Sequence, residues 1–165
     1  MHIYSFPPIS TPQARILILG TMPGKMSLIQ QQYYAHPRNA FWPIMGELFS
    51  FDAREDYALR KTRLMRAEVA LWDVLQSCIR ESSLDSDIDN KSIVANNFSD
   101  FLDAHPLIDR IGFNGAKAAQ LFRRHVQPFL AIEKQTLNYL FLPSTSPAHA
   151  GKTFSDKLLA WRAIL

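Results

Sequence analysis

The chain of 165 residues is 47% apolar and 20% charged, a composition that excludes a disordered protein and supports one core, so we expect a single domain over residues 1–165. No apolar run approaches the roughly 18 residues of a membrane span, and the first residues lack a secretory signal, so we expect a cytoplasmic protein that binds no membrane. The net charge of +3 permits an anionic partner. The single cysteine, Cys78, excludes a disulfide within the chain, a multi-cysteine zinc site and an iron–sulfur cluster, so we expect neither a metal nor a cofactor.

The elements predicted along the chain alternate between strands and helices. Continuous apolar runs predict strands, and apolar residues spaced by three and four predict helices. The expected strands are residues 15–19, 69–75, 107–113 and 137–142, and the expected helices are residues 39–49, 54–67, 97–104, 116–125 and 155–165. Because strands separated by helices are joined by crossovers, we expect an α/β three-layer sandwich with a central four-stranded parallel sheet.

Polar and conformationally special residues follow each predicted strand. They are residues 20–24 after the first strand, Asp73 near the end of the second, Asn114 after the third and residues 144–149 after the fourth. The carboxyl ends of parallel strands meet at one edge of the sheet, where α/β proteins place their active sites. The sequence therefore predicts one cleft at this edge.

The first two polar segments each allow a functional and a structural interpretation. Residues 20–24, with two glycines around a proline, match neither a P-loop nor a dinucleotide fingerprint, and such a loop can also be an ordinary tight turn. Residues 33–42 combine two tyrosines, a rigid proline and Asn39 at a helix start. Asn39 could simply cap that helix, the tyrosines could pack, and Phe41 and Trp42 fit the core.

Several segments resemble, in the same order, motifs of the uracil-DNA glycosylase superfamily. They are residues 20–24 (GTMPG), 34–42 (YAHPRNAFW), 71–75 (LWDVL), 113–115 (FNG) and 142–149 (LPSTSPAH). The resemblance runs from about Arg15 to the last residue. It is closest to the hypoxanthine-DNA glycosylase branch, also called DNA-deoxyinosine glycosylase, near the mismatch-specific uracil and thymine glycosylases. The family's parallel sheet between helices agrees with the predicted architecture.

The resemblance implies which residues would cleave the bond between base and sugar. In much of the superfamily the third residue of the first motif is an Asp, Asn or Glu that orients water, but this chain has Met22, whose thioether cannot do so. The hypoxanthine branch is thought to use the Asn that matches Asn39, whose amide oxygen would hold the water. His149 would stabilise the departing base or contact a phosphate, or it is a surface histidine.

Four residues are expected to contact the base that leaves the DNA stack. Met22 would line the pocket, and Tyr34 matches the aromatic residue that stacks on the base in mismatch-specific relatives. A carboxylate at Asp73 would accept the N1–H of hypoxanthine or the N3–H of uracil and repel adenine, although Asp73 could instead cap the following turn. Asn114 could donate to a base carbonyl or satisfy the helix that follows it.

The glycine loop and the last motif are expected to contact DNA. The residues concerned are Gly20, Thr21, Pro23, Gly24, Ser144, Thr145, Ser146, Pro147 and Ala148. In the superfamily the last motif enters the minor groove, so its hydroxyls would contact phosphates and Pro147 and Ala148 would form a wedge. The basic clusters at residues 60–66 and 123–124 are more typical of solvated helix faces.

These observations predict a monofunctional DNA glycosylase of base excision repair that acts as a monomer on double-stranded DNA containing a deaminated base. Hypoxanthine is the expected base and uracil the nearest alternative. A non-catalytic nucleic-acid or nucleotide-binding domain of the same fold remains open because of Met22, as does an enzyme that acts on free nucleosides.

Overall fold

A central sheet of four parallel strands organises the computed structural model, which describes residues 1–165. The strand order is β3 (Val69–Asp73), β2 (Ile16–Gly20), β6 (Arg110–Asn114) and β7 (Asn138–Leu142). Every residue of β2 is buried, as expected for a strand with neighbours on both sides and helices above and below. The α/β architecture with a four-stranded parallel sheet is therefore confirmed.

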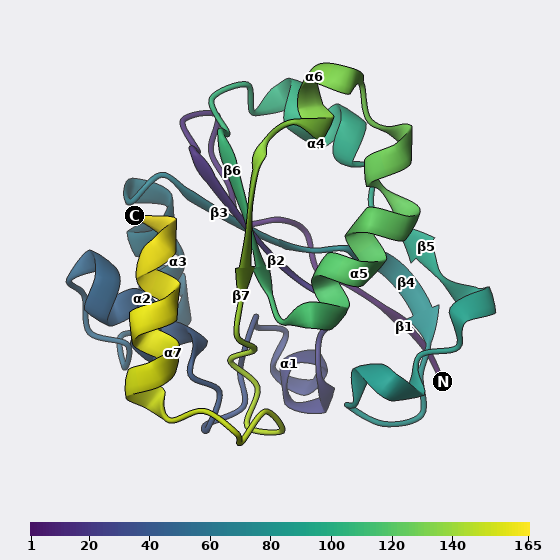
Figure 1. Cartoon of the computed structure of the whole chain (residues 1–165). Helices are drawn as coiled ribbons and strands as arrows, with labels where there is room; N and C mark the ends of the chain where they lie inside the picture. Colours follow the sequence, from purple (N-terminus) through teal and green to yellow (C-terminus); the bar gives the residue numbers. More distant parts are fainter.

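Helices cover both faces of this sheet (Figure 1). The helices α2 (Phe41–Phe49), α3 (Tyr57–Arg66) and α7 (Phe154–Trp161) lie on one face, and α4 (Phe98–Ala104) and α5 (Ala116–His125) lie on the other. Side chains of β2 alternate between the two faces, so Ile16 and Ile18 join one apolar cluster while Leu17 and Leu19 join the other. No helix is long and apolar enough to cross a membrane.

A second, antiparallel sheet was not predicted from the sequence. It consists of β1 (His2–Tyr4), β4 (Leu75–Ile79) and β5 (Val94–Ala95). The strand expected over residues 69–75 is wrong at its end, because β3 stops at Asp73 and the chain continues through Val74 into β4. The side-chain amide of Asn96 donates to the carbonyl oxygens of Asp73 and Leu75 at this junction. The change of sheet is not visible in the sequence, because apolar residues continue on both sides of Asp73.

Other boundaries differ from the prediction by a few residues. The strand expected from residue 107 begins at Arg110, the helix expected from residue 54 begins at Tyr57, and the last helix ends at Trp161 before a 3₁₀ turn, η4 (Arg162–Ile164). The short helices α1 (Lys25–Gln30) and α6 (Ile132–Gln135) were not predicted. Further 3₁₀ turns are η1 (Asp85–Asp87), η2 (Asn90–Ser92) and η3 (Gln127–Phe129). Short helices give weak periodic signals, which explains these omissions.

Candidate active site

A cleft of about 920 Å³ opens at the carboxyl edge of the central sheet. The last residues of β2, β3 and β6 line it together with residues of the loops, including the loop after β7. This edge lies at the bottom of Figure 1, near α1. Every residue that the sequence predicts for the site lines this cleft. The structure therefore brings these residues together, and their individual contacts decide what each can do.

Two polar side chains without partners converge at Gly20, the last residue of β2. A Cβ atom on Gly20 would lie 2.6 Å from Oδ1 of Asp73 and 2.7 Å from Oη of Tyr34. Oη of Tyr34 and Oδ2 of Asp73 are buried and form no hydrogen bond within the protein. Burial, and next the charge of Asp73, raises the pKa of Tyr34, so its hydroxyl stays protonated. Because buried polar atoms are nearly always paired, these two atoms indicate a place for a polar ligand.

Asp73 carries an unusual buried carboxyl group. The side chain is 3% exposed, and burial raises its pKa to about 8, with a further upward effect from Asp85 and an opposing effect from Arg80. The turn amides that follow β3 do not use this group, because the N–H groups of residues 74 and 75 donate to main-chain carbonyl oxygens of the first loop. The alternative in which Asp73 caps the turn is therefore wrong. At neutral pH the carboxyl group is mainly protonated and can both donate and accept.

The two adjacent tyrosines have different roles. Tyr33 is buried, and its hydroxyl donates to the main chain of residues 6–7, so the packing interpretation holds for Tyr33. Tyr34 has a φ of 53°, in the left-handed region that aromatic residues rarely adopt. Its ring lies against Phe41, with centroids 4.3 Å apart and planes inclined by 30°. Phe41 covers one face of the Tyr34 ring, so a base could stack only on the other face.

Asn39 lies in the cleft wall just before α2 and is half-buried. Its Oδ1 accepts a hydrogen bond of 2.9 Å from the main-chain N–H of Phe41. The N-cap of α2 is Ala40, which has no side-chain cap, so the capping interpretation of Asn39 is wrong and its side chain instead forms a local turn just before the helix. An amide oxygen accepts two hydrogen bonds, so this contact leaves one lone pair for a water molecule.

Asn114 joins two of the loops that line the cleft. Its Nδ2 donates to the hydroxyl of Thr145 over 2.9 Å, and its Oδ1 accepts from the main-chain N–H of Thr145 over 2.9 Å. Helix α5 begins after Gly115 without a side-chain cap. The expectation that Asn114 satisfies this helix is therefore wrong, and its amide instead fixes the loop after β7.

The loop of residues 144–149 is held by its own hydroxyl groups. The hydroxyl of Ser144 accepts from the N–H of Ser146, and that of Ser146 accepts from the N–H of Ala148. Thr145 is 1% exposed, so its hydroxyl cannot reach a phosphate. The phosphate contact expected for this hydroxyl is therefore wrong. His149 is exposed at the rim.

The first loop packs its methionine inward. Met22 is 8% exposed and belongs to an apolar cluster as well as to the cleft lining, so its thioether, which cannot orient water, lies at the wall of the cleft. Thr21 is also buried. Among residues 1–165, no three His, Cys, Asp or Glu side chains are arranged to hold a metal ion.

Sequence reasoning missed a buried arginine behind the first loop. Arg80 follows β4, is 2% exposed, and donates from Nη2 to the carbonyl oxygen of Pro23. Its Nη1 lies 3.7 Å from Oδ1 of Asp85, which also lines the cleft together with Ser83. An arginine after an apolar run was visible in the sequence, but no spacing connected it with residues 20–24.

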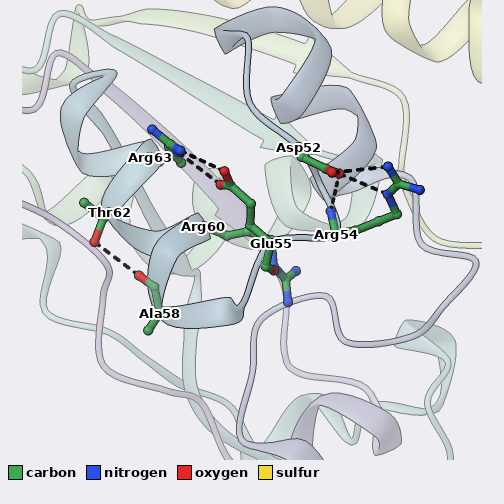
Figure 2. Close-up of polar contacts among 7 residues, drawn as sticks. All are labelled: Asp52, Arg54, Glu55, Ala58, Arg60, Thr62 and Arg63. Carbon is green, nitrogen blue, oxygen red and sulfur yellow. Dashed lines mark hydrogen bonds and ion pairs between the residues drawn. The ribbon is translucent and has the colours of Figure 1, made fainter.

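The basic residues of α3 serve the fold. Figure 2 shows Arg63 forming two hydrogen bonds, of 3.0 and 2.7 Å, with the carboxylate of Glu55. Arg60 donates to the main-chain oxygen of Glu55, and its guanidinium lies 4.7 Å from the ring centroid of Trp42. These arginines fix the segment between α2 and α3, away from the cleft lining.

Comparisons with known proteins give a consistent result. The family model described as the uracil DNA glycosylase superfamily matches residues 7–165. A hypoxanthine DNA glycosylase from Methanosarcina barkeri is 37% identical over 121 residues, which cover 73% of this chain and 75% of that protein. A hypoxanthine DNA glycosylase from Methanosarcina acetivorans is 35% identical over 116 residues, covering 70% and 72%. The solution NMR structure of a candidate uracil DNA glycosylase from M. acetivorans superposes with a TM-score of 0.80 at 30% identity, over 99% of both chains.

Proposed function

The chain belongs to the uracil-DNA glycosylase superfamily, and from this premise we propose that it is a monofunctional DNA glycosylase that removes hypoxanthine from double-stranded DNA during base excision repair. The observation that carries the proposal is the cleft in which Asp73, Tyr34 and Asn39 surround one space. The names of the two relatives support hypoxanthine as the base.

Hydrolysis requires few protein groups. Water adds to C1′ of the deoxyribose, the bond from C1′ to the base nitrogen breaks, and the base leaves with the bonding electrons and takes up a proton. The sugar becomes positive and the base negative in the transition state, so oriented dipoles lower the barrier. We assign the orientation of water to the free lone pair on Oδ1 of Asn39. The exposed His149 at the rim is assigned to a phosphate or to the departing base.

The proposal also requires a particular hydrogen-bonding edge on the base. Hypoxanthine and uracil both present an N–H beside a carbonyl oxygen. A protonated Asp73 accepts from that N–H and donates to the carbonyl oxygen, which gives two hydrogen bonds in one plane. Adenine offers the reverse pair, an acceptor beside an amino group, which a protonated acid also satisfies. Rejection of adenine by charge therefore needs ionised Asp73, so discrimination should increase as the pH rises through about 8.

A single-turnover assay on synthetic duplexes tests the proposal. We expect abasic sites in duplexes that carry hypoxanthine, slower release or none with uracil, xanthine and ethenoadenine, and no cleavage of free deoxyinosine. Comparing hypoxanthine with adenine at pH 7 and pH 9 measures the contribution of Asp73. Cleavage of free deoxyinosine alone indicates a nucleoside enzyme, and tight DNA binding without cleavage of any duplex indicates a non-catalytic domain.

Lysine chemistry is the competing mechanism. A bifunctional glycosylase forms a Schiff base with the sugar, and Lys25 is the lysine that lines the cleft, where it is exposed. The monofunctional proposal expects no covalent complex with DNA when borohydride is added during turnover. Trapping that is lost in Lys25→Met would contradict it.

A further inference from the structure

A second groove, of about 730 Å³, runs along the outer edge of the central sheet. Figure 1 shows β7 at the front of the view, between α5 and α7, and β7 is an edge strand because it pairs only with β6. Side chains from β7, α5 and the segment between β7 and α7 line the groove. None of these side chains except Ser144 and His149 belongs to the candidate active site.

The groove exposes an aromatic ring on a strand that otherwise packs. Phe141 of β7 is 75% exposed, although large apolar side chains are usually buried. Its ring is nearly parallel to that of Phe113, with an interplanar angle of 27° and centroids 5.8 Å apart. Tyr139 lies two residues earlier on the same strand and is half-buried in the groove wall. This arrangement gives a supported aromatic surface that faces solvent.

The charges around the groove favour an anion. Arg123 of α5 and Lys152 before α7 are both exposed and line it, and no aspartate or glutamate does. Neither cation forms an ion pair within residues 1–165, in contrast with Arg63, which is held by Glu55. The position of Arg123 is also favourable for the fold, because it lies in the last turn of α5, where the helix dipole is negative. That effect does not account for Lys152.

The groove adjoins the active-site cleft, because Ser144 and His149 line both. We propose that it binds an unpaired nucleotide of the same DNA strand that places its damaged base in the cleft, with the base stacked on Phe141 and the phosphate near Arg123 and Lys152. The proposal rests on the proposed function. Bases within a duplex are already stacked on each other, so only an unpaired base can use Phe141, and aromatic stacking tolerates any base.

Binding of short, lesion-free oligonucleotides, measured by fluorescence anisotropy, tests this proposal. We expect Phe141→Ala to weaken the binding of single-stranded DNA by at least about fivefold and to change duplex binding by less than twofold, because stacking contributes mainly to unpaired bases. Phe141→Tyr should restore single-strand affinity. The control is Ile132→Ala on α6, which removes a side chain that is 80% exposed and does not line the groove.

Two results would overturn the proposal. The first is equal single-strand affinity in Phe141→Ala and Ile132→Ala at unchanged melting temperature. The second is a change of oligomeric state in Phe141→Ala without DNA, measured by light scattering, which would identify the groove as an interface between proteins. Because the oligonucleotides carry no lesion, failure of base excision contradicts only the proposed function, and failure of this binding test contradicts only the groove.

Discussion

A single oxygen atom of Asn39 carries both a structural and a proposed chemical role, and a substitution can separate the two. Asn39→Ala removes the contact with the N–H of Phe41 and the proposed water contact together. Asn39→Ser keeps a local acceptor for the N–H two residues on, but its hydroxyl is too short to occupy the position of the amide oxygen. We expect both variants to lose about 10²-fold or more in single-turnover rate.

Thermal melting provides the matched measurement for this pair. Loss of this local hydrogen bond costs about 1 kcal/mol, so Asn39→Ala should melt at a lower temperature than Asn39→Ser. A near-native excision rate in Asn39→Ser would show that the residue only holds the start of α2, and the water-orienting assignment would then be wrong.

The raised pKa of Asp73 also makes a prediction about stability. Its carboxyl group has a pKa of about 8 in the folded protein and about 3.9 in an unfolded chain. Between these values the folded state binds more protons than the unfolded state. The free energy of unfolding therefore has its full Asp73 contribution below about pH 4 and loses it as the pH rises toward 8, by up to about 1.4 kcal/mol per pH unit.

Asp73→Asn removes this titration and nearly preserves the shape of the side chain. We expect the variant to gain stability relative to the natural protein as the pH rises from 5 to 8, measured by urea unfolding at each pH. The amide also offers an acceptor beside a donor, so it can form both hydrogen bonds that we assign to protonated Asp73. Excision of hypoxanthine at pH 7 should therefore be largely kept in Asp73→Asn and should be slower in Asp73→Ala. Parallel pH–stability curves for the two proteins would contradict a buried, protonated carboxyl group.

At the level of elements, apolar runs predicted the four parallel strands, of which β2, β3 and β6 are largely buried while the edge strand β7 is apolar in sequence but leaves Phe141 exposed. The same signal failed where β3 continues into β4, since Val74 and Leu75 are also buried and nothing local distinguishes one sheet from the other. The residue types of the site were predictable from their places after strands. Their pairing was not, because the bond between Asn114 and Thr145 joins positions 31 residues apart. The protonation of Asp73 was not predictable either, because it depends first on burial and then on Asp85 and Arg80, from a segment with no predicted role.

Helix α7 supports the loop of residues 144–149 through a buried lysine. Lys157 is 6% exposed, and its Nζ donates to the carbonyl oxygen of Ser146 over 3.4 Å. Burial lowers the pKa of Lys157, which reflects the cost of keeping an ammonium group out of water. Lys157→Met should keep the packing of the stem and release the loop. We expect DNA binding to weaken roughly three- to tenfold, since a weak charged hydrogen bond contributes about 1 kcal/mol.

The stability of Lys157→Met should be unchanged or slightly higher, because a desolvated charge is removed. Lys91→Met, which changes an exposed lysine on η2, is the control for loss of one positive charge. DNA affinity measured at one salt concentration for all three proteins checks the prediction. Equal loss in both variants would mean that Lys157 acts only through its charge.

The whole molecule has a net charge of only +3, but its charges are unevenly distributed. The cations that line the cleft and the groove are Lys25, Arg38, Arg123 and Lys152. Among the acidic residues of the segment after β4, Asp85 also lines the cleft. We therefore expect these four cations to be the ones that meet a DNA backbone bound at the cleft and the groove.

This distribution predicts the salt dependence of DNA binding. Each phosphate neutralised by a protein cation releases counterions and adds about −0.9 to the slope of log affinity against log salt, so four contacts give a slope no steeper than about −4. Arg38 is exposed, lines the cleft and forms no ion pair, so Arg38→Gln should make the slope shallower by about 0.9. Arg63→Gln removes the same charge from an arginine already held by Glu55 and should leave the slope unchanged. Equal changes in the two variants would show that DNA responds to net charge alone, and a flat slope in the natural protein would favour an enzyme that acts on free nucleosides.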